Sequence, residues 1–81
     1  MPQKITDTSL IAFHKQIGFN VKKAREEKGI TQLELSQRLG YTSVSVVSKA
    51  EKCIENKHFS LEQLYRIANE LKIDLCSLIK S

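Results

Sequence analysis

Cysteine, proline and long apolar runs are all scarce in this sequence of 81 residues. The two cysteines, Cys53 and Cys76, form no Cys-x-x-Cys pair, and neither histidine stands at a metal-ligand spacing from them. A zinc site is therefore not expected, and the sequence predicts no metal and no cofactor. Both cysteines should stay reduced, because disulfides do not persist in a reducing cytosol.

Long apolar segments are also missing. The longest apolar runs, such as residues 10–13, span four residues, whereas a membrane helix needs about 20. Residues 1–7 lack the apolar core of a signal peptide. We therefore expect a protein that has no membrane segment and stays in the cytoplasm.

Enzyme motifs are not visible either. The three glycines form no phosphate-cradling loop, and we find no nucleophile–base set and no paired-carboxylate site. A chain this short forms one domain and buries only about 60% of its unfolded surface, which leaves little room for an active-site cavity. The sequence therefore indicates a protein that is not an enzyme.

Positive charge is what the chain has in excess. Thirteen Lys and Arg residues against nine Asp and Glu residues give a formal net charge of +4. Such a balance suits an anionic partner, either a nucleic acid or an acidic protein. Charge alone does not choose between these two partners.

Apolar residues at spacings of three and four predict a first helix over residues 9–28. The stripe consists of Leu10, Phe13, Ile17, Val21 and Ala24. Ser9 is the expected N-cap, and Gly29 can adopt the left-handed conformation that ends a helix. The polar residues 1–8 are expected to form a flexible arm, and residues 9–81 one domain.

A helix, a tight turn and a second helix are predicted over residues 32–52. Thr31 and Glu34 fit a capping box at the start of the first of these helices, and Gly40 ends it. Leu35 and Leu39 should point inward, with the small Ser36 beside them. A short turn that contains glycine holds two such helices at a steep angle, so that the second can enter the major groove.

The second helix of this unit should run from residue 44 to about residue 52, capped by Thr42 or Ser43. Val47, Ala50 and Ile54 are the expected inner side, which leaves positions 44, 45, 48 and 49 on the outer side. β-Branched residues at 44–47 favour a strand by propensity. We reject a strand because the connection to the preceding helix is too short for a sheet.

The remaining residues predict a loop and two further helices. Residues 53–59 form the loop, and the pair Ser60 and Gln63 fits a second capping box. Asp74 is the expected cap of a last short helix. The apolar faces consist of Leu61, Leu64, Ile67, Ala68 and Leu71, and then of Leu75, Leu78 and Ile79. The fold class is therefore all-α, with five helices and no strand.

Seven short segments occur in a fixed order and at near-constant spacing over residues 10–79. They are Ile17–Gly18, Val21–Gln32, Leu35–Ser36, Leu39–Tyr41, Ser48–Glu51, Ser60–Ala68 and Leu71–Leu75. This series resembles the lambda-repressor/Cro-type (Xre) helix-turn-helix family. The resemblance implies a five-helix DNA-binding domain that acts as a transcriptional regulator, of repressor or controller type, on double-stranded DNA.

The resemblance also implies roles for individual residues. Val44, Ser45 and Lys49 match base-contacting positions, which the helical periodicity independently exposes, and Ser43 at the start of the helix joins them. Lys49 suits guanine O6 and N7, and Val44 suits a thymine methyl group. The recognition helix carries no Arg, Asn or Gln, so apolar contacts, water and DNA shape should contribute to specificity.

Phosphate contacts are expected on both sides of that helix. Thr31 and Gln32 match the helix start at which the family binds phosphate, and the alternative is that they only cap the helix. Lys52, Asn56 and Lys57 flank the loop that follows, where they either bind phosphate or form a hydrophilic surface. The resemblance further implies a structural ion pair between Arg25 and Glu51, and Cys53 stands where the family often has glycine.

Two functions remain open on the sequence alone. The first is a DNA-binding regulator that acts as a homodimer, with Ile73 and Ile79 near the surface as candidate dimer contacts. The alternative is an antitoxin-like or adaptor module that binds a protein with the same fold, which the valine- and serine-rich third helix favours. In the monomeric alternative, the last apolar residues simply close the core.

Overall fold

The computed structural model describes residues 8–80, and all of their regular secondary structure is helical. The helices are α1 (Thr8–Glu27), α2 (Gln32–Arg38), α3 (Ser45–Lys52), α4 (Leu61–Leu71) and α5 (Cys76–Ile79), and a 3-10 turn, η1 (Ile54–Asn56), follows α3. The prediction of an all-α fold with five helices is confirmed. No helix in this part of the chain has the length and apolar character needed to cross a bilayer.

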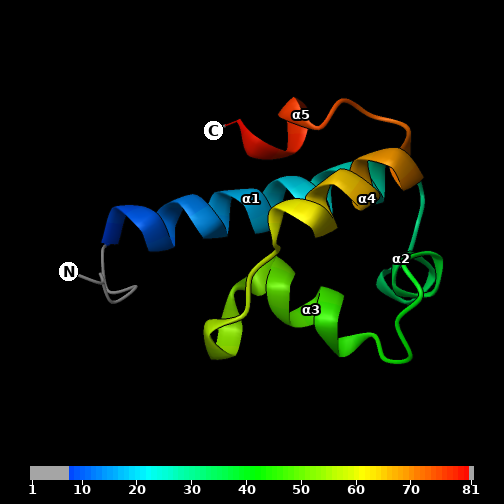
Figure 1. Ribbon diagram of the computed structural model, residues 1–81, viewed down its shortest axis with the longest axis horizontal. Coiled ribbons are helices and arrows are strands. Elements are labelled where there is room, and N and C mark those ends of the chain that lie inside the picture. The colour runs from blue at the N-terminus through cyan, green and yellow to red at the C-terminus, as the bar shows by residue number, and fades with distance from the viewer. Residues whose placement is uncertain (1–7, 81) are drawn as a thin grey trace.

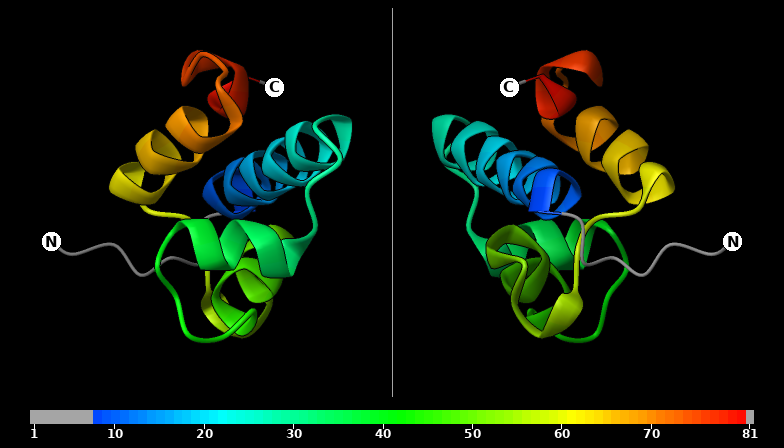
Figure 2. Two further views of the ribbon diagram at one scale, coloured as in Figure 1. Left: turned by 90° about the vertical axis from the view of Figure 1, so that its right-hand side faces the viewer. Right: turned by 90° about the vertical axis from the view of Figure 1, so that its left-hand side faces the viewer.

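The helices form three levels. α1 and α4 lie side by side in the middle, α5 packs on one side of them, and α2 and α3 pack on the other (Figures 1 and 2). α1 is the longest helix and contacts α3, α4 and α5. The arrangement leaves the outer side of α3 at one end of the molecule, away from the other helices.

Local capping chemistry determines where α2 and α4 begin. The Thr31 hydroxyl accepts from the Glu34 amide at 3.0 Å, and the Glu34 carboxylate accepts from the Thr31 amide at 3.1 Å. Ser60 and Gln63 make the same reciprocal pair, at 3.1 and 2.8 Å. Both capping boxes are therefore confirmed, and each satisfies amides that a helix start otherwise leaves without a partner.

The predicted ends of the other helices are mostly confirmed. Gly29 and Gly40 have φ values of +70° and +84°, the left-handed conformation expected after α1 and α2. The Asp74 carboxylate accepts from the Cys76 amide at 3.0 Å at the start of α5. The prediction for Ser9 is wrong in position, because α1 begins at Thr8 and Ser9 lies within its first turn. The rest of the predicted arm lies outside the described residues.

A single apolar core joins all five helices. Its largest fully buried side chains are Leu35, Ile67, Leu71, Leu78, Val21 and Val47. Leu39 and Leu64, also predicted, are buried with them. Burying each such side chain contributes about 1.5–3 kcal/mol.

Four residues that were predicted to face the core lie at the surface. Leu10 and Phe13 are exposed because the first turns of α1 extend beyond the helices that cover the rest of it (Figure 1). Leu61 is 68% exposed at the first position of α4, and Ile54 is exposed because the chain leaves the helical path at Cys53. Helical spacing is correct for Leu10, Phe13 and Leu61, but no neighbouring helix covers them, whereas Ile54 lies beyond the end of α3.

α1 and α3 approach so closely at Gly18 that their backbones are nearly in contact. A Cβ atom at this position would lie 2.4 Å from the carbonyl oxygen of Glu51 and 2.9 Å from that of Ala50. Only glycine lets the two helices pack at this distance. Gly18 therefore determines how far the end of α3 lies from α1.

Candidate nucleic-acid interface

The turn between α2 and α3 is held by hydrogen bonds from its own backbone and from α4. After Gly40, the Tyr41 amide donates to the Ser36 carbonyl oxygen at 2.9 Å. From α4, Arg66 donates to the Leu39 carbonyl oxygen at 2.6 Å, and Gln63 donates to the Tyr41 hydroxyl at 3.0 Å. These bonds hold the direction in which the chain enters α3.

Ser43 lies two residues before the first residue of α3 and bonds to it. Its hydroxyl accepts from the Ser45 amide at 3.1 Å and also bonds the Ser45 hydroxyl at 2.9 Å. The N-cap position itself is occupied by Val44, which makes no side-chain capping bond, so neither Thr42 nor Ser43 is the N-cap that the sequence predicts. The helix begins at Ser45, one residue later than expected, and Val44 stands at its edge.

The inner side of α3 is confirmed for Val47 and Ala50, which are buried in the core. On the outer side Val44 is exposed, while Ser45, Ser48 and Lys49 are half-buried. Val46 is also exposed, although it is not among the positions that the sequence places opposite the core. It lies on the flank of the outer side, so a wider sector of the helical wheel includes it.

A buried ion pair links the end of α3 to α1. The Arg25 Nε atom lies 2.8 Å from Glu51 Oε2, and the two side chains are 7% and 1% exposed. Arg25 also donates from Nη2 to Glu51 Oε1 at 3.2 Å and from Nη1 to the Ile30 carbonyl oxygen at 2.8 Å. A bidentate pair of this kind holds its partners in one geometry, because the guanidinium group is planar and rigid.

Gln32, at the start of α2, joins the same network. Its amide nitrogen donates to Glu51 Oε1 at 2.9 Å, which leaves its carbonyl oxygen and one N–H for another partner. Thr31 beside it is exposed, and its hydroxyl oxygen accepts from Glu34 while its O–H remains a donor. The start of α2 and the end of α3 therefore meet at Glu51.

Lys49 has a partner that the sequence patterns did not predict. Its Nζ atom lies 2.8 Å from Glu55 Oε1, and the two side chains are 35% and 61% exposed. The hydrogen bond from Lys49, together with the lysine charge, lowers the pKa of Glu55 below its ordinary value. Solvent screens an exposed pair of this kind, so it contributes little to stability.

The loop after α3 has unusual backbone geometry. Cys53, Glu55 and Asn56 have φ values of 54°, 54° and 59°, in the left-handed region that residues other than glycine rarely adopt. Each costs about 1–2 kcal/mol, and less for Asn. Cys53 ends α3 in the left-handed conformation that glycine usually supplies.

The basic and polar residues of this segment are accessible. Lys52, Asn56 and Lys57 are exposed, as a phosphate contact requires. An open hollow of about 410 Å³ runs beside α3 and is lined by Ser45, Val46, Lys49, Ala50, Lys57, His58 and Gln63. The structure thus gathers Ser45, Lys49 and Lys57 on one surface.

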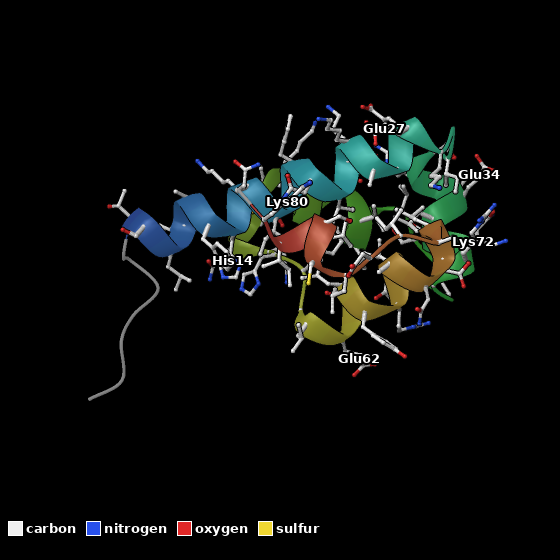
Figure 3. The ribbon with its side chains drawn as sticks, turned by 90° about the horizontal axis from the view of Figure 1, so that it is seen from above. His14, Glu27, Glu34, Glu62, Lys72 and Lys80 are labelled. Carbon is white, nitrogen blue, oxygen red and sulfur yellow. The ribbon has the colours of Figure 1, made fainter. Side chains whose placement is uncertain are left out.

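Two histidines connect α1 to the segment before α4. The rings of His14 and His58 stack with centroids 3.9 Å apart and an angle of 19° between them, and His14 lies on the side of α1 that faces α4 (Figure 3). Burial, followed by the charge of His58, lowers the pKa of His14. Within residues 8–80 no three His, Cys, Asp or Glu side chains are placed to hold a metal ion.

Comparison with known proteins identifies the family. The family model described as Helix-turn-helix matches residues 21–78, which is more than half of the chain and includes α2, α3 and α4 in full. No curated protein and no solved structure matches the chain. The matched segment holds the turn at Gly40, the buried Arg25–Glu51 pair and the exposed outer side of α3. The chain therefore belongs to the helix-turn-helix family of the lambda-repressor and Xre type.

Proposed function

We propose that the protein is a sequence-specific transcriptional regulator, of repressor or controller type, that inserts α3 into the major groove of DNA. The outer side of α3 carries this proposal: it presents Val44, Ser45, Val46 and Lys49 while its inner side is held in the core. The major groove is wide enough for one helix, and base edges are read there by hydrogen bonds and apolar contacts.

We assign base recognition to the four residues that the sequence predicts, Ser43, Val44, Ser45 and Lys49. We add Val46, because its side chain is exposed on α3. The Lys49 ammonium group can donate to guanine O6 and N7, and the hydroxyls of Ser43 and Ser45 can donate or accept. Val44 and Val46 supply methyl groups against thymine. Because this set is short of bidentate groups, water-mediated contacts and DNA shape supply part of the specificity.

Phosphate contacts lie on both sides of α3 in this proposal. Thr31 and Gln32 retain free donors at the start of α2, while Lys52 ends α3 and Asn56 and Lys57 follow it. Contacts with phosphates fix the register of the helix on the duplex but carry no sequence information. Binding should therefore weaken steeply as the salt concentration rises.

Homodimer formation is part of the proposal, since operators of this class pair two half-sites about one helical turn apart. Ile73 and Ile79 are half-buried and pack against the core, so they offer less free surface than the sequence indicated. Sedimentation of the free protein across micromolar concentrations, with and without duplex, measures the association. Monomer mass throughout, with one protein per palindromic duplex, contradicts a dimer.

Selection of bound sequences from a random DNA pool tests the function. We expect one recurrent motif whose two halves lie about 10 base pairs apart. Lys49→Ala should relax the preference at one base position, whereas the matched change Lys52→Ala should weaken binding to all DNA sequences alike. A pool without enrichment, together with no salt-dependent binding to duplex DNA, would instead favour a protein-binding adaptor.

A further inference from the structure

Glu55 is an acidic residue on a surface that is otherwise suited to a polyanion. It lies in the loop after α3, between the exposed Lys52 and Lys57, and its side chain is mostly exposed. A carboxylate in this place repels phosphate and reduces the electrostatic part of DNA binding. Its position next to the proposed base-reading lysine therefore needs a physical explanation.

The contact between Glu55 and Lys49 is specific in geometry. The Glu55 carboxylate reaches back across the end of α3 to the Lys49 ammonium group at 2.8 Å. The loop makes this possible through the left-handed backbone of Glu55 and of Asn56 after it. Such conformations persist only where the surrounding structure holds them, so the loop directs the carboxylate toward α3.

An ammonium group has three N–H donors, and the Glu55 carboxylate occupies one of them. Two donors remain, which is the number that guanine O6 and N7 can accept. An unpaired lysine on its flexible stem is a mobile point charge that binds the nearest phosphate on any sequence. Pairing with Glu55 restricts the motion of the Lys49 side chain and weakens the attraction between its ammonium group and phosphates. The two remaining N–H donors stay available for a base edge.

We propose that Glu55 is a positioning residue that holds the Lys49 ammonium group for base recognition and so lowers binding to non-cognate DNA. This inference rests on the proposed function, since it assumes that α3 reads bases. It adds a determinant of specificity that is itself outside the recognition helix. Glu55 acts through Lys49 and need not touch the DNA.

The test compares the wild type with Glu55→Gln, which keeps the shape of the side chain and removes its charge. Dissociation constants are measured for the selected duplex and for a shuffled duplex over a series of salt concentrations. Affinity for the shuffled duplex should rise by about three- to ten-fold. The slope of the logarithm of its binding constant against the logarithm of the salt concentration should become steeper by about one. Affinity for the selected duplex should change less than about two-fold, so the ratio of the two affinities falls.

The matched control is Glu70→Gln, which makes the same change of net charge at an exposed position on α4. It should shift both affinities equally and by less than about two-fold. In a Lys49→Ala background, Glu55→Gln should no longer change the ratio, because Glu55 acts through the lysine. Thermal unfolding of each variant verifies that the fold is intact.

Two outcomes overturn the proposal. If Glu55→Gln raises both affinities by the same factor, the carboxylate only repels phosphate and does not position Lys49. If it changes neither affinity, the pair has no role in binding. Failure of the proposed function is distinguishable from both, because the wild type would then show no preference for any duplex before a variant is made.

Discussion

Replacement of Gly18 by alanine tests the close crossing of α1 and α3, on which the orientation of the recognition helix depends. The added Cβ atom would lie 2.4 Å from the Glu51 carbonyl oxygen and 2.9 Å from both the Glu51 carbonyl carbon and the Ala50 oxygen. Carbon–oxygen contacts of this kind normally exceed about 3.3 Å. All three atoms belong to the backbone, so a rotamer change gives no relief, and the helices must separate by about 1 Å.

The magnitude follows from two opposing effects. Overpacking of this kind costs about 1–3 kcal/mol and sometimes more, whereas alanine gains about 1 kcal/mol over glycine within a helix. The displacement also moves the end of α3, which carries Glu51, away from Arg25 and strains a buried ion pair. Because the strain on this pair offsets the gain from alanine, we expect a net loss of about 1–3 kcal/mol, which lowers the melting temperature of a domain of this size by roughly 5–20 °C.

Thermal and urea unfolding followed by circular dichroism measure this change. Lys22→Ala is the control, because it places alanine at an exposed position of the same helix and should change stability by less than about 0.5 kcal/mol. A Gly18→Ala variant as stable as the wild type would contradict a close backbone contact between α1 and α3. The α1–α3 distance would then be adjustable, and Gly18 would not determine the position of α3.

Three further predictions concern the buried pair, the core and pH. Glu51→Leu leaves the Arg25 charge buried without its partner and should cost about 3–5 kcal/mol in urea unfolding; the double variant Arg25→Met/Glu51→Leu should cost much less, and equal costs would contradict a buried pair. Leu64→Ala should cost about 2–5 kcal/mol by the same assay, and a loss of a few tenths would show that the inner face of α4 is misassigned. The pKa of His14 is lowered from its ordinary value of 6.5, so the unfolded chain binds more protons just below that pH. Its contribution to stability should therefore be complete above about pH 6.5 and decline as the pH falls below it, and unfolding between pH 5 and 7 should show a weaker pH dependence for His14→Phe.

Features that depend on local chemistry could be predicted from the sequence. The capping boxes at Thr31 and Ser60 and the helix end at Gly29 follow from side chains within three or four residues of one another. The structure confirms each of them. The tight turn and the inner side of α3 follow in the same way, because periodicity and turn length are properties of short segments.

Features that depend on distant segments could not be predicted. Whether Leu10 or Leu61 is buried depends on how far neighbouring helices extend, which helical spacing does not reveal. The Lys49–Glu55 contact crosses the end of a helix through residues with left-handed backbone, and sequence rules assign that conformation to glycine. The role of Gly18 appears only once α1 and α3 are placed together.

Backbone amide chemical shifts test the proposal that the outer side of α3 binds DNA. A uniformly ¹⁵N-labelled sample is titrated with the duplex obtained by selection. We expect the largest shifts at residues 43–49, smaller ones at Thr31 and Gln32, and little change in α5. Shifts concentrated in α5 or on the outer side of α4, or none with any duplex, would contradict it.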